Sequence, residues 1–544
     1  MTTTQDPELL AKVLAAVDAA DLGADASRGG PAPEDAAKEK TAEAKKQAKE
    51  AAKEKRPRSI QGAVAASDAV LVERVVADCL DGRYCWSPAL GWMLWNGRVW
   101  ERVDKATVYE DVRLYLADWV IREIARPTLG VGPDELMKTL TKGKIVALAT
   151  LAQGQILVNG EDFDAEPDLI TCENGVIDLC EGTLLPHDPD LHLTRYIPTK
   201  YVPGAQHPDA DAALNAMEPE VRDWMAVRLG QGVTGHVPDD DVMLLLHGDG
   251  QNGKSSLIDS LTLTLGGRTD HGAMTPIDDA VLAGDRDAKE ERMALKGARL
   301  AFAEELPEGR RLNVTQVKKA VGTATMKARH LYSNEVLWVT SHTLILTTNY
   351  LPEVSETDHG TWRRLLKVPF PYTYVREPSA PHERQGDGQL KTRLEGAAQR
   401  EAMLAWLVAG ARRWYAAGRQ MPDHPDAVKT ATTSWREESD VVLRYWNDRL
   451  VPDLDAHVMS GDLKDDLTAY LKDAGKTPWS DKTIADRFGP HDTTKRAGVT
   501  KQNIRQRAGL SRPEVDDTAW GSARKPVPGR YHAWLGVRFR ASDE

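Results

Sequence analysis

The chain has 544 residues, of which 41% are hydrophobic, and it carries a formal net charge of −12. This length and apolar content predict about three folded domains with sizeable cores. The negative charge argues against a protein that coats nucleic acid over its whole surface, so any DNA contact is expected in a pore or on one small module. Because no apolar run reaches the roughly 18 residues that span a bilayer, we expect no membrane partner and a cytoplasmic location.

Residues 1–60 are predicted to be a disordered or charged helical tail. They are rich in Ala, Lys, Glu and Asp, and few branched or aromatic residues occur between Val17 and Ile60. Such a stretch cannot bury enough apolar surface to offset the entropy lost on ordering. A solvated helix is a simpler use of its charges than DNA contact.

A first folded domain is predicted over residues 67–205. It begins with a helical pattern of apolar residues and continues into a hairpin whose turn falls at Asn96-Gly97. The tryptophans around this hairpin favour packing over a base-stacking platform. Asp162 and Asp164 are flanked by polar residues rather than by an apolar strand, which favours a solvated loop over a primase carboxylate pair.

A glycine-rich motif at residues 248–255 organises the rest of the chain. It follows an apolar run at 242–247, precedes a helix-compatible segment, and fits the pattern G-x-x-x-x-G-K-[ST]. In this pattern backbone N–H groups cradle phosphates, the lysine reaches the β and γ oxygens, and the hydroxyl binds Mg²⁺. The alternative is a glycine-rich surface turn with a solvated lysine, which the flanking strand and helix patterns disfavour. The residues predicted to bind ATP are Gly248, Asp249, Gly250, Gln251, Asn252, Gly253, Lys254, Ser255 and Ser256.

Three features after this loop suit ATP hydrolysis. Glu304-Glu305 ends an apolar run, where carboxylates can hold Mg²⁺ and activate water. Asn349 ends a third apolar run, where its amide can sense the γ-phosphate and the attacking water. Arg363-Arg364 follows, and a guanidinium delivered to a neighbour's γ-phosphate would neutralise charge in the transition state. Each feature also has a common structural explanation, namely a strand-end acid pair, a turn residue and a surface salt bridge.

The composition changes after this region. A segment rich in Pro, Gly and Glu at about 376–389 predicts a linker. The apolar pattern from Leu394 to Tyr415 then predicts an amphipathic helix that packs back on the ATPase core.

The order of these motifs is similar to that of the superfamily 3 helicases, and most similar to the helicase half of phage and plasmid primase-helicases and the related poxvirus-type replication ATPases. The resemblance rests on Gly-x-Gly-x-Asn-Gly-Lys-Ser, the Glu-Glu pair, Leu-Ile-Leu-Thr-Thr-Asn-Tyr-Leu-Pro and Trp-Arg-Arg-Leu, with upstream Trp-Asn-Gly-x-x-Trp and Glu-Asn-Gly-Val-Ile-Asp-Leu. It implies an α/β P-loop, AAA+-like ATPase core over residues 211–420, preceded by a mainly α helicase-associated N-terminal domain. It also implies a ring, usually of six subunits, that hydrolyses ATP at subunit interfaces and drives single-stranded DNA through a central pore.

The resemblance assigns roles to particular residues. Lys254 and Ser255 would bind the triphosphate and Mg²⁺. Glu304 and Glu305 would be the Walker B acids, the first holding the metal and the second being the better general base. The remaining matches are the sensor, Asn349, and the arginine finger acting in trans, Arg364 with its neighbour Arg363.

The same resemblance places DNA-gripping residues in the segment that leads to a pore hairpin, namely Lys318, Lys327, Arg329 and, as a further candidate, His342. The family commonly has Thr-Gly-Gly-Asp within this segment. This chain has Val-Gly-Thr-Ala at 321–324 instead, so the carboxylate is missing. A solvated helix face explains the basic residues equally well.

Residues 440–544 are predicted to form a winged-helix-like domain. A helix with one apolar face precedes a short helix capped by Ser480, and Tyr531–Arg540 alternates as a strand does. Basic residues are dense between these segments: Lys495, Arg496, Lys501, Arg505, Arg507 and Arg512. DNA binding and protein interaction both remain open for this domain.

Together these features predict an ATP- and Mg²⁺-dependent replicative DNA helicase that translocates on single-stranded DNA, with origin duplex DNA as a second candidate partner. No primase half is visible, so a separate primase or polymerase is expected, in the host cytoplasm if a phage encodes the chain. Two alternatives keep the ATP site. One is a remodelling or loading ATPase without processive unwinding, and the other is an ATP-gated origin-binding protein.

Overall fold

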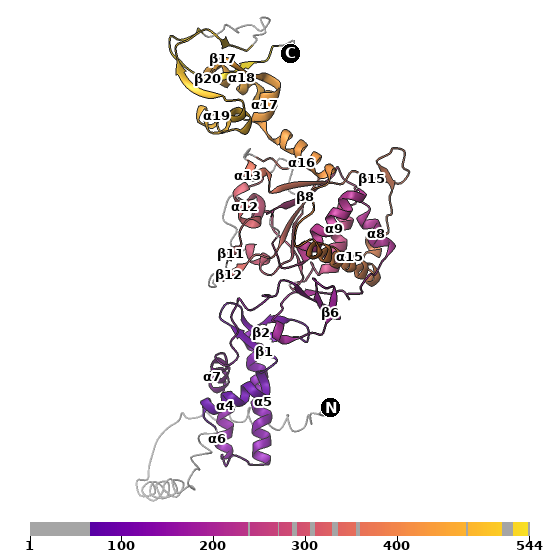
Figure 1. The fold of residues 1–544 in the computed structure, drawn as a ribbon. Helices are drawn as coiled ribbons and strands as arrows, with labels where there is room; N and C mark the ends of the chain where they lie inside the picture. The colour runs from indigo at the N-terminus through magenta and orange to yellow at the C-terminus, as the bar shows by residue number, and fades with distance from the viewer. Residues whose placement is uncertain are drawn as a thin grey trace, which may run out of the picture. The chain divides into compact units, whose positions relative to one another are not determined.

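The computed structural model describes residues 66–237, 240–269, 271–284, 291–304, 311–328, 336–354, 359–474, 477–513 and 526–541. The predicted tail at 1–60 lies outside these residues. The chain divides into two compact units, the first ending at Asp162 and the second comprising 97–99 and everything from Phe163 onward. Figure 1 labels the elements of both units. Among the described helices, none has both the length and the apolar content needed to cross a bilayer.

The first unit combines helices with a small antiparallel sheet. Its predicted first helix is present, as is the predicted hairpin, in which Trp95 pairs with Trp100 across the turn. The long helix α5 begins where the Asp104 side chain accepts a hydrogen bond from the Ala106 N–H, which is a typical N-cap. The elements are α4 (Asp68–Val75), a π-helical turn (Val76–Leu80), β1 (Tyr84–Ser87), β2 (Gly91–Trp95), β3 (Trp100–Val103), α5 (Lys105–Ala125), α6 (Pro133–Met137) and α7 (Lys142–Ala152).

The segment at 163–205 was predicted to belong to the first domain, but it groups with the second unit. It forms a four-stranded sheet of order β6-β5-β4-β7, from β4 (Leu169–Cys172), β5 (Gly175–Asp178), β6 (Thr183–Leu185) and β7 (Tyr196–Ile197). Ile170 and Ile177 of this sheet share a hydrophobic core with the strands and helices around the glycine-rich loop. Turn and strand signals predicted these short strands, but a local pattern does not say which core they join.

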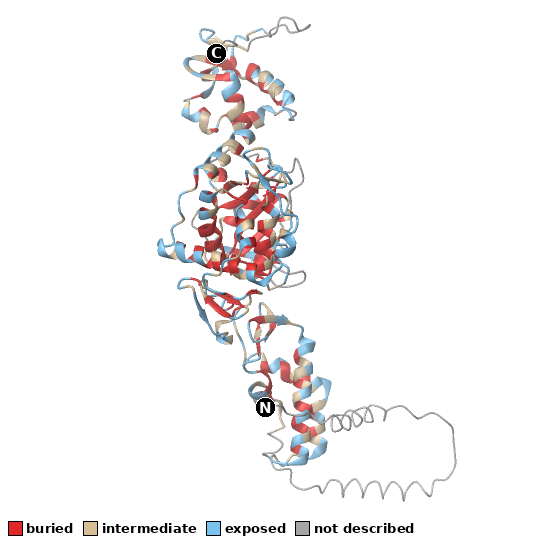
Figure 2. Ribbon diagram, turned by 90° about the vertical axis from the view of Figure 1, so that its right-hand side faces the viewer, coloured by how far each residue is buried: buried red, intermediate tan, exposed pale blue. Residues whose placement is uncertain are grey.

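A five-stranded parallel sheet forms the centre of the second unit, in the order β14-β8-β13-β10-β9. Its strands are β8 (Met243–His247), β9 (Met274–Pro276), β10 (Leu300–Ala303), β13 (Thr343–Thr348) and β14 (Leu365–Pro369). Successive residues of β8 enter two different cores, because alternate side chains point to opposite faces. Parallel sheets are typically buried in this way on both faces, and Figure 2 shows the buried residues concentrated in these strands and the helices around them.

Helices α9 (Pro219–Val233), α10 (Lys254–Leu265) and α15 (Ala397–Ala416) contribute to one of these cores, and α11 (Ala280–Ala283) and α12 (Val314–Val321) to the other. The prediction that the amphipathic helix after residue 394 packs back on the core is confirmed. Its contact with α9 depends on Gly410, where a Cβ would overlap the Ala226 carbonyl oxygen. The backbones of α9 and α15 therefore approach too closely at this point for a side chain at residue 410.

The remaining elements of this core surround the loop region. They are α8 (Pro208–Leu214), β11 (Thr325–Ala328), β12 (Val336–Val339), α13 (His359–Trp362), β15 (Thr373–Val375), β16 (Glu383–Gln385) and α14 (Leu390–Arg393). A linker was predicted over 376–389, but β16 lies within it and pairs in parallel with β15.

The C-terminal region contains helices and a four-stranded sheet of order β18-β20-β17-β19. The predicted cap is present, because the Ser480 hydroxyl accepts a hydrogen bond from the Thr483 N–H. Strand β17 was not predicted, and its Leu454 is 86% exposed. The elements are α16 (Asp426–Ser439), α17 (Val441–Arg449), β17 (Leu450–Met459), α18 (Ser460–Asp473), α19 (Asp481–Phe488), α20 (Asp492–Arg496), β18 (Thr500–Ile504), β19 (Leu510–Ser511) and β20 (Tyr531–Phe539).

Candidate functional site

The glycine-rich loop joins the end of β8 to the start of α10, as the sequence predicts. Gly250 and Gly253 have φ angles of +100° and +83°, a region that side chains disfavour. A Cβ on Gly248 would collide with the side-chain amide of Asn252. The loop backbone can therefore take this path only with glycine at these positions.

The loop ends on an uncapped helix N-terminus. Gly253 occupies the position before α10 and has no side chain to cap the helix, and the Lys254 N–H donates to Asn252 Oδ1 over a long 3.5 Å. These N–H groups carry partial positive charge and point out of the helix, which makes them suitable donors to a phosphate. The local chain path therefore produces an anion-binding concavity.

Lys254 is the link between this loop and the neighbouring strand. Its side chain is buried, and Nζ donates hydrogen bonds to the Gly248 carbonyl oxygen at 2.7 Å, Asn252 Oδ1 at 3.1 Å and Asn349 Oδ1 at 2.8 Å. Asn349 directly follows β13, which pairs with β8 in parallel, so the two strands end at the same edge of the sheet. The structure thus brings together the lysine and the amide that the sequence assigned to one site.

A cavity of about 870 Å³ opens over the loop, within the roughly 300–1,000 Å³ typical of small-molecule sites. Residues Gly250–Ser256 line it together with Glu304 and Asn349. Gly248 and Asp249, also predicted to bind ATP, are not among its lining residues. The carboxyl ends of β8, β10 and β13 therefore contribute to one pocket.

Ser255 and Glu304 are the residues predicted to hold Mg²⁺. Both are exposed in the cavity, and neither side chain bonds to another described residue. A hydroxyl and a carboxylate are hard oxygen donors of the kind Mg²⁺ prefers, so this pair fits the ion. Glu305, the predicted general base, lies outside the described residues.

Two aromatic side chains beside the loop are uncharged. Burial, helped by nearby Lys367, lowers the pKa of His247 to about 4. Burial raises the pKa of Tyr374, whose phenol stays protonated. At neutral pH neither group adds charge to the loop, where Lys254 supplies a cation.

The two arginines of the predicted finger differ in their surroundings. Arg364 donates to the Gly360 carbonyl oxygen at 2.7 Å and forms an ion pair with Asp241 at 3.4 Å, both within its own chain. Arg363 is exposed. Neither lines the cavity of its own chain. The preference for Arg364 therefore changes to Arg363, because the former is engaged locally.

The predicted DNA-contacting residues differ in their surroundings. Lys318 lies in α12, and Lys327 is exposed on β11, whereas Arg329 falls outside the described residues. His342 is buried, bonds to the Ala320 carbonyl oxygen at 2.9 Å, and has a pKa lowered to about 4 by burial. A neutral, inaccessible imidazole is not suited to grip a phosphate, so we withdraw this candidate.

Sequence reasoning missed one wall of the cavity. Tyr374–Arg376, Gln385–Gly388, Leu390 and Lys391 line it, partly within the predicted linker at 376–389 and partly on either side of it. The only sequence signal there is Gly386-Asp387-Gly388, a second short glycine pair, which is too common to indicate a site. Proximity to the loop arises through the sheet, since β14 pairs with β8 and the chain then continues into β15.

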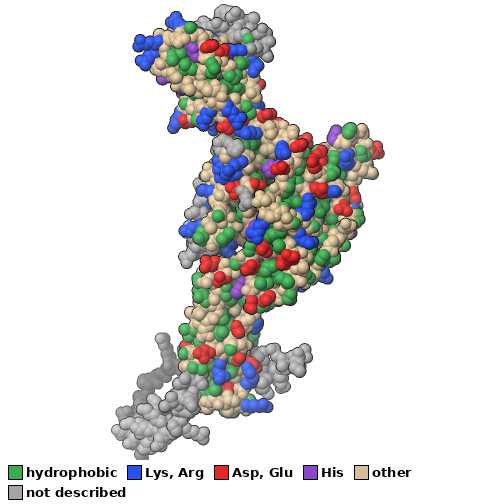
Figure 3. Space-filling view, viewed as in Figure 1, with side chains coloured by type: hydrophobic (Ala, Val, Ile, Leu, Met, Phe, Trp, Pro, Cys, Tyr) green, Lys and Arg blue, Asp and Glu red, His purple; other side chains and the backbone are tan. Residues whose placement is uncertain are grey.

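The basic C-terminal residues are partly committed to the fold. Figure 3 shows Lys and Arg side chains on the visible face of this region. Arg512 is paired with Asp462, its Nε lying 2.8 Å from a carboxylate oxygen. Lys501 is exposed and sits 5.1 Å from the centroid of the Trp534 ring. Arg512 therefore contributes to stability, whereas exposed residues such as Lys501 remain accessible.

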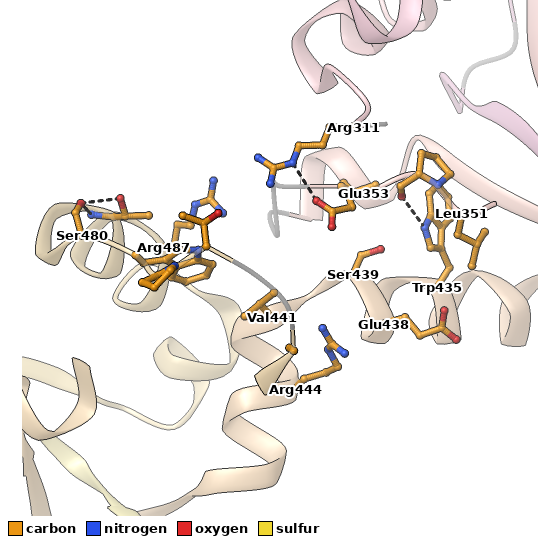
Figure 4. A pocket seen from close by; sticks show the side chains of 17 residues that line it. Arg311, Leu351, Glu353, Trp435, Glu438, Ser439, Val441, Arg444, Ser480 and Arg487 are labelled. Atoms are coloured by element: carbon orange, nitrogen blue, oxygen red, sulfur yellow. Dashed lines mark hydrogen bonds and ion pairs between the residues drawn. The ribbon is translucent and has the colours of Figure 1, made fainter. Parts of the chain in front are cut away.

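A second cavity of about 830 Å³ contains none of the phosphate-loop residues (Figure 4). There the Arg311 guanidinium is paired with Glu353 at 2.9 Å, and the Trp435 indole donates to the Pro352 carbonyl oxygen at 3.3 Å. Neither Glu304 nor Asn349 reaches this cavity. Of the predicted ATP-site residues, Gly250–Ser256, Glu304 and Asn349 line the first cavity and not the second.

Comparison with known families gives a match over residues 71–226, to the family described as D5 N terminal like. This match covers the first unit from residue 71 onward and the second unit up to residue 226. The match is consistent with the predicted helicase-associated region. It ends before the glycine-rich loop begins.

Particular relatives come from large DNA viruses. A protein of African swine fever virus, provisionally named a primase, is 25% identical over 330 residues, or 57% of this chain and 34% of that protein. A protein of Acanthamoeba polyphaga mimivirus, provisionally named a helicase, is 25% identical over 308 residues, or 53% of this chain and 31% of that protein. A third, from Frog virus 3 and also provisionally named a helicase, is 24% identical over 422 residues, or 62% of this chain and 40% of that protein. The matched region thus spans between 31% and 40% of the length of these relatives.

Among solved structures, the apo NrS-1 C-terminal region (305–718) aligns with 81% of this chain and 97% of its own length. Its sequence identity is 10% and its TM-score is 0.41. By sequence, the chain is similar at low identity to viral proteins named primases and helicases.

Proposed function

We propose that the chain is an ATP hydrolase that works as a replicative DNA helicase of the superfamily 3 type, assembled as a hexameric ring on single-stranded DNA. The observation that carries this proposal is the contact of Lys254 Nζ with Asn349 Oδ1 across two adjacent strands, at the floor of a cavity over the glycine-rich loop. A triphosphate entering there would take the lysine from its present oxygen partners. The names of the viral relatives support the same class of activity.

Each residue then has a defined task. The loop N–H groups and the start of α10 bind the phosphates, and Lys254 neutralises the terminal ones. Ser255 and Glu304 would hold Mg²⁺, which would supply charge neutralisation to the bound phosphates. Asn349 orients the attacking water and Glu305 accepts its proton.

A neighbouring subunit completes the site. Arg363 is exposed and is the proposed arginine finger, worth about 10³ to 10⁵ in rate where such fingers have been measured. Movement of DNA would then follow hydrolysis through Lys318, Lys327 and Arg329. The C-terminal region is the proposed contact for origin duplex DNA or a protein, and a separate primase or polymerase would act beside the ring in the cytoplasm.

ATP hydrolysis and strand separation measured together test this proposal. The wild-type chain is expected to hydrolyse ATP faster with single-stranded DNA than without it and to separate a forked duplex, whereas Lys254→Ala abolishes both activities. Lys429→Ala is a control that removes an exposed lysine paired with Asp426 and outside the cavity lining, and it keeps wild-type hydrolysis.

The outcomes separate the alternatives. DNA-stimulated hydrolysis without strand separation would favour the remodelling or loading ATPase. Full replication function in Glu305→Gln would favour the ATP-gated origin-binding protein. Equal hydrolysis in wild type and Lys254→Ala would refute the ATP site.

A further inference from the structure

The missed wall of the cavity begins with a direct attachment to the phosphate loop. After β14 the Phe370 N–H donates to the His247 carbonyl oxygen, and the Tyr374 N–H donates to the Gln251 carbonyl oxygen at 2.7 Å. The chain then projects from the core as the β15–β16 arm (Figure 1). Strand β15 is therefore fixed to the same backbone that would hold the phosphates.

The Tyr374 ring lies against that loop. A Cβ built on Gly253 would sit 3.2 Å from the Tyr374 Cε2 atom, so the half-buried ring runs alongside the residue that precedes Lys254. The same ring belongs to the lining of the cavity. A flat aromatic surface thus borders the phosphate site on one side.

Ion pairs hold the rest of the wall in place. The Arg393 guanidinium bonds to Asp209 at 2.8 Å and to Asp387 at 2.5 Å, which connects the turn after β16 to α8. Lys391 pairs with Asp259 of α10 at 3.2 Å. The Gly386 N–H also bonds to the Val375 carbonyl oxygen at 2.8 Å. The wall is therefore attached to both helices that flank the cavity.

The sheet order gives the cavity two different ends. Strands β13 and β10 lie on one side of β8, and they contribute Asn349 and Glu304. Strand β14 lies on the other side and leads into β15, where the lining includes Tyr374, Leu390 and, on the helices, Ile258. One end thus carries the polar groups suited to a γ-phosphate, and the other offers an aromatic ring and apolar side chains beside the charged groups of Arg376, Asp387 and Lys391.

We propose that the β15–β16 arm is the nucleoside-binding wall of this site, with the Tyr374 ring packing against the base-bearing end of the bound triphosphate. The inference rests on the proposed ATP binding. It adds Tyr374 as the residue that contacts the nucleoside and so favours a nucleotide over polyphosphate alone. Arg393 acts as a positioning residue, because it holds the arm without lining the cavity.

Calorimetric titration with ATP and with inorganic tripolyphosphate, both with Mg²⁺, tests the assignment. Tyr374→Ala is expected to weaken ATP binding about tenfold or more, the effect of losing one aromatic stack on a base, while tripolyphosphate binding stays within about twofold of wild type. Tyr374→Phe keeps the ring and is expected to restore ATP binding. Tyr372→Ala is the matched control, because Tyr372 stacks under Arg384 at 4.1 Å and does not line the cavity.

Other results overturn the inference. Wild-type ATP affinity in Tyr374→Ala would remove the ring from the nucleoside end. An equal loss for ATP and tripolyphosphate would show that the tyrosine supports the phosphate loop instead, and failure of Tyr374→Phe to restore binding would show that the hydroxyl is what matters. If wild type binds neither probe, it is the proposed ATP site that fails.

Discussion

Alanine at Gly253 and at Gly250 is expected to produce different losses of stability, although both residues belong to the phosphate loop. At Gly253, with φ at +83°, a left-handed backbone costs an L residue about 1–2 kcal/mol. The new Cβ would also lie 2.6 Å from the Ala216 Cβ, inside van der Waals contact, and overpacking of this kind costs about 1–3 kcal/mol. Gly253→Ala should therefore lower the free energy of unfolding by about 2–5 kcal/mol.

Gly250 separates the two contributions. Its φ is +100°, but a Cβ there meets nothing within 4 Å, so Gly250→Ala should cost only the conformational part, about 1–2 kcal/mol. Urea unfolding followed by circular dichroism measures both variants, and ATP titration is expected to show weakened binding in both, because each methyl group enters the loop. Equal stability of the two variants would refute the steric reasoning, and wild-type ATP affinity in both would refute the assignment of the loop to phosphate.

Three further predictions concern the arginine pair, a buried histidine and a helix contact. Arg363→Ala should reduce ATP hydrolysis in the assembled protein without lowering its melting temperature, whereas Arg364→Ala should lower the melting temperature because it breaks contacts within its own chain. The pKa of His342 falls from 6.5 to about 4 in the fold, so the unfolded state binds more protons in this interval and stability is lost as pH falls from 6.5 towards 4. At pH about 5 the loss is on the order of 2 kcal/mol, and His342→Gln should reduce the difference in melting temperature between neutral and acidic buffer; an unchanged difference would contradict this. Gly410→Ala should destabilise by about 1–3 kcal/mol through overlap with a neighbouring helix. Gly461→Ala, in a helix with open space around the Cβ, should stabilise by up to about 1 kcal/mol, and the opposite order in urea unfolding would disprove the close approach.

The sequence predicted best where one short segment carries the whole signal. The glycine motif predicted a strand, a tight turn and a helix, and β8 and α10 are both present. The cap at Ser480 and the hairpin at Asn96-Gly97 were predicted for the same reason, since a few adjacent residues determine them. Motif order also selected Asn349, whose contact with Lys254 makes the candidate site chemically coherent.

His342 and the predicted linker show why other assignments made from the sequence differ from the structure. A basic residue type alone suggested a DNA contact, but burial and accessibility depend on what packs around a side chain, and His342 lies inside. The segment 376–389 has the composition of a linker, yet its position beside the loop follows from the pairing of β14 with β8. Composition does not reveal such neighbours.

The sequence by itself determined the glycine-rich loop, its lysine and the order of polar strand ends, because backbone conformation and chemical type at these points are local properties. Only the tertiary structure decided that β13 lies beside β8, that 163–205 joins the second unit, and that the arm carrying Tyr374 closes one side of the cavity. The physical reason is that sheet order and shared cores arise from contacts between residues far apart in the chain, whose pairing no local pattern specifies.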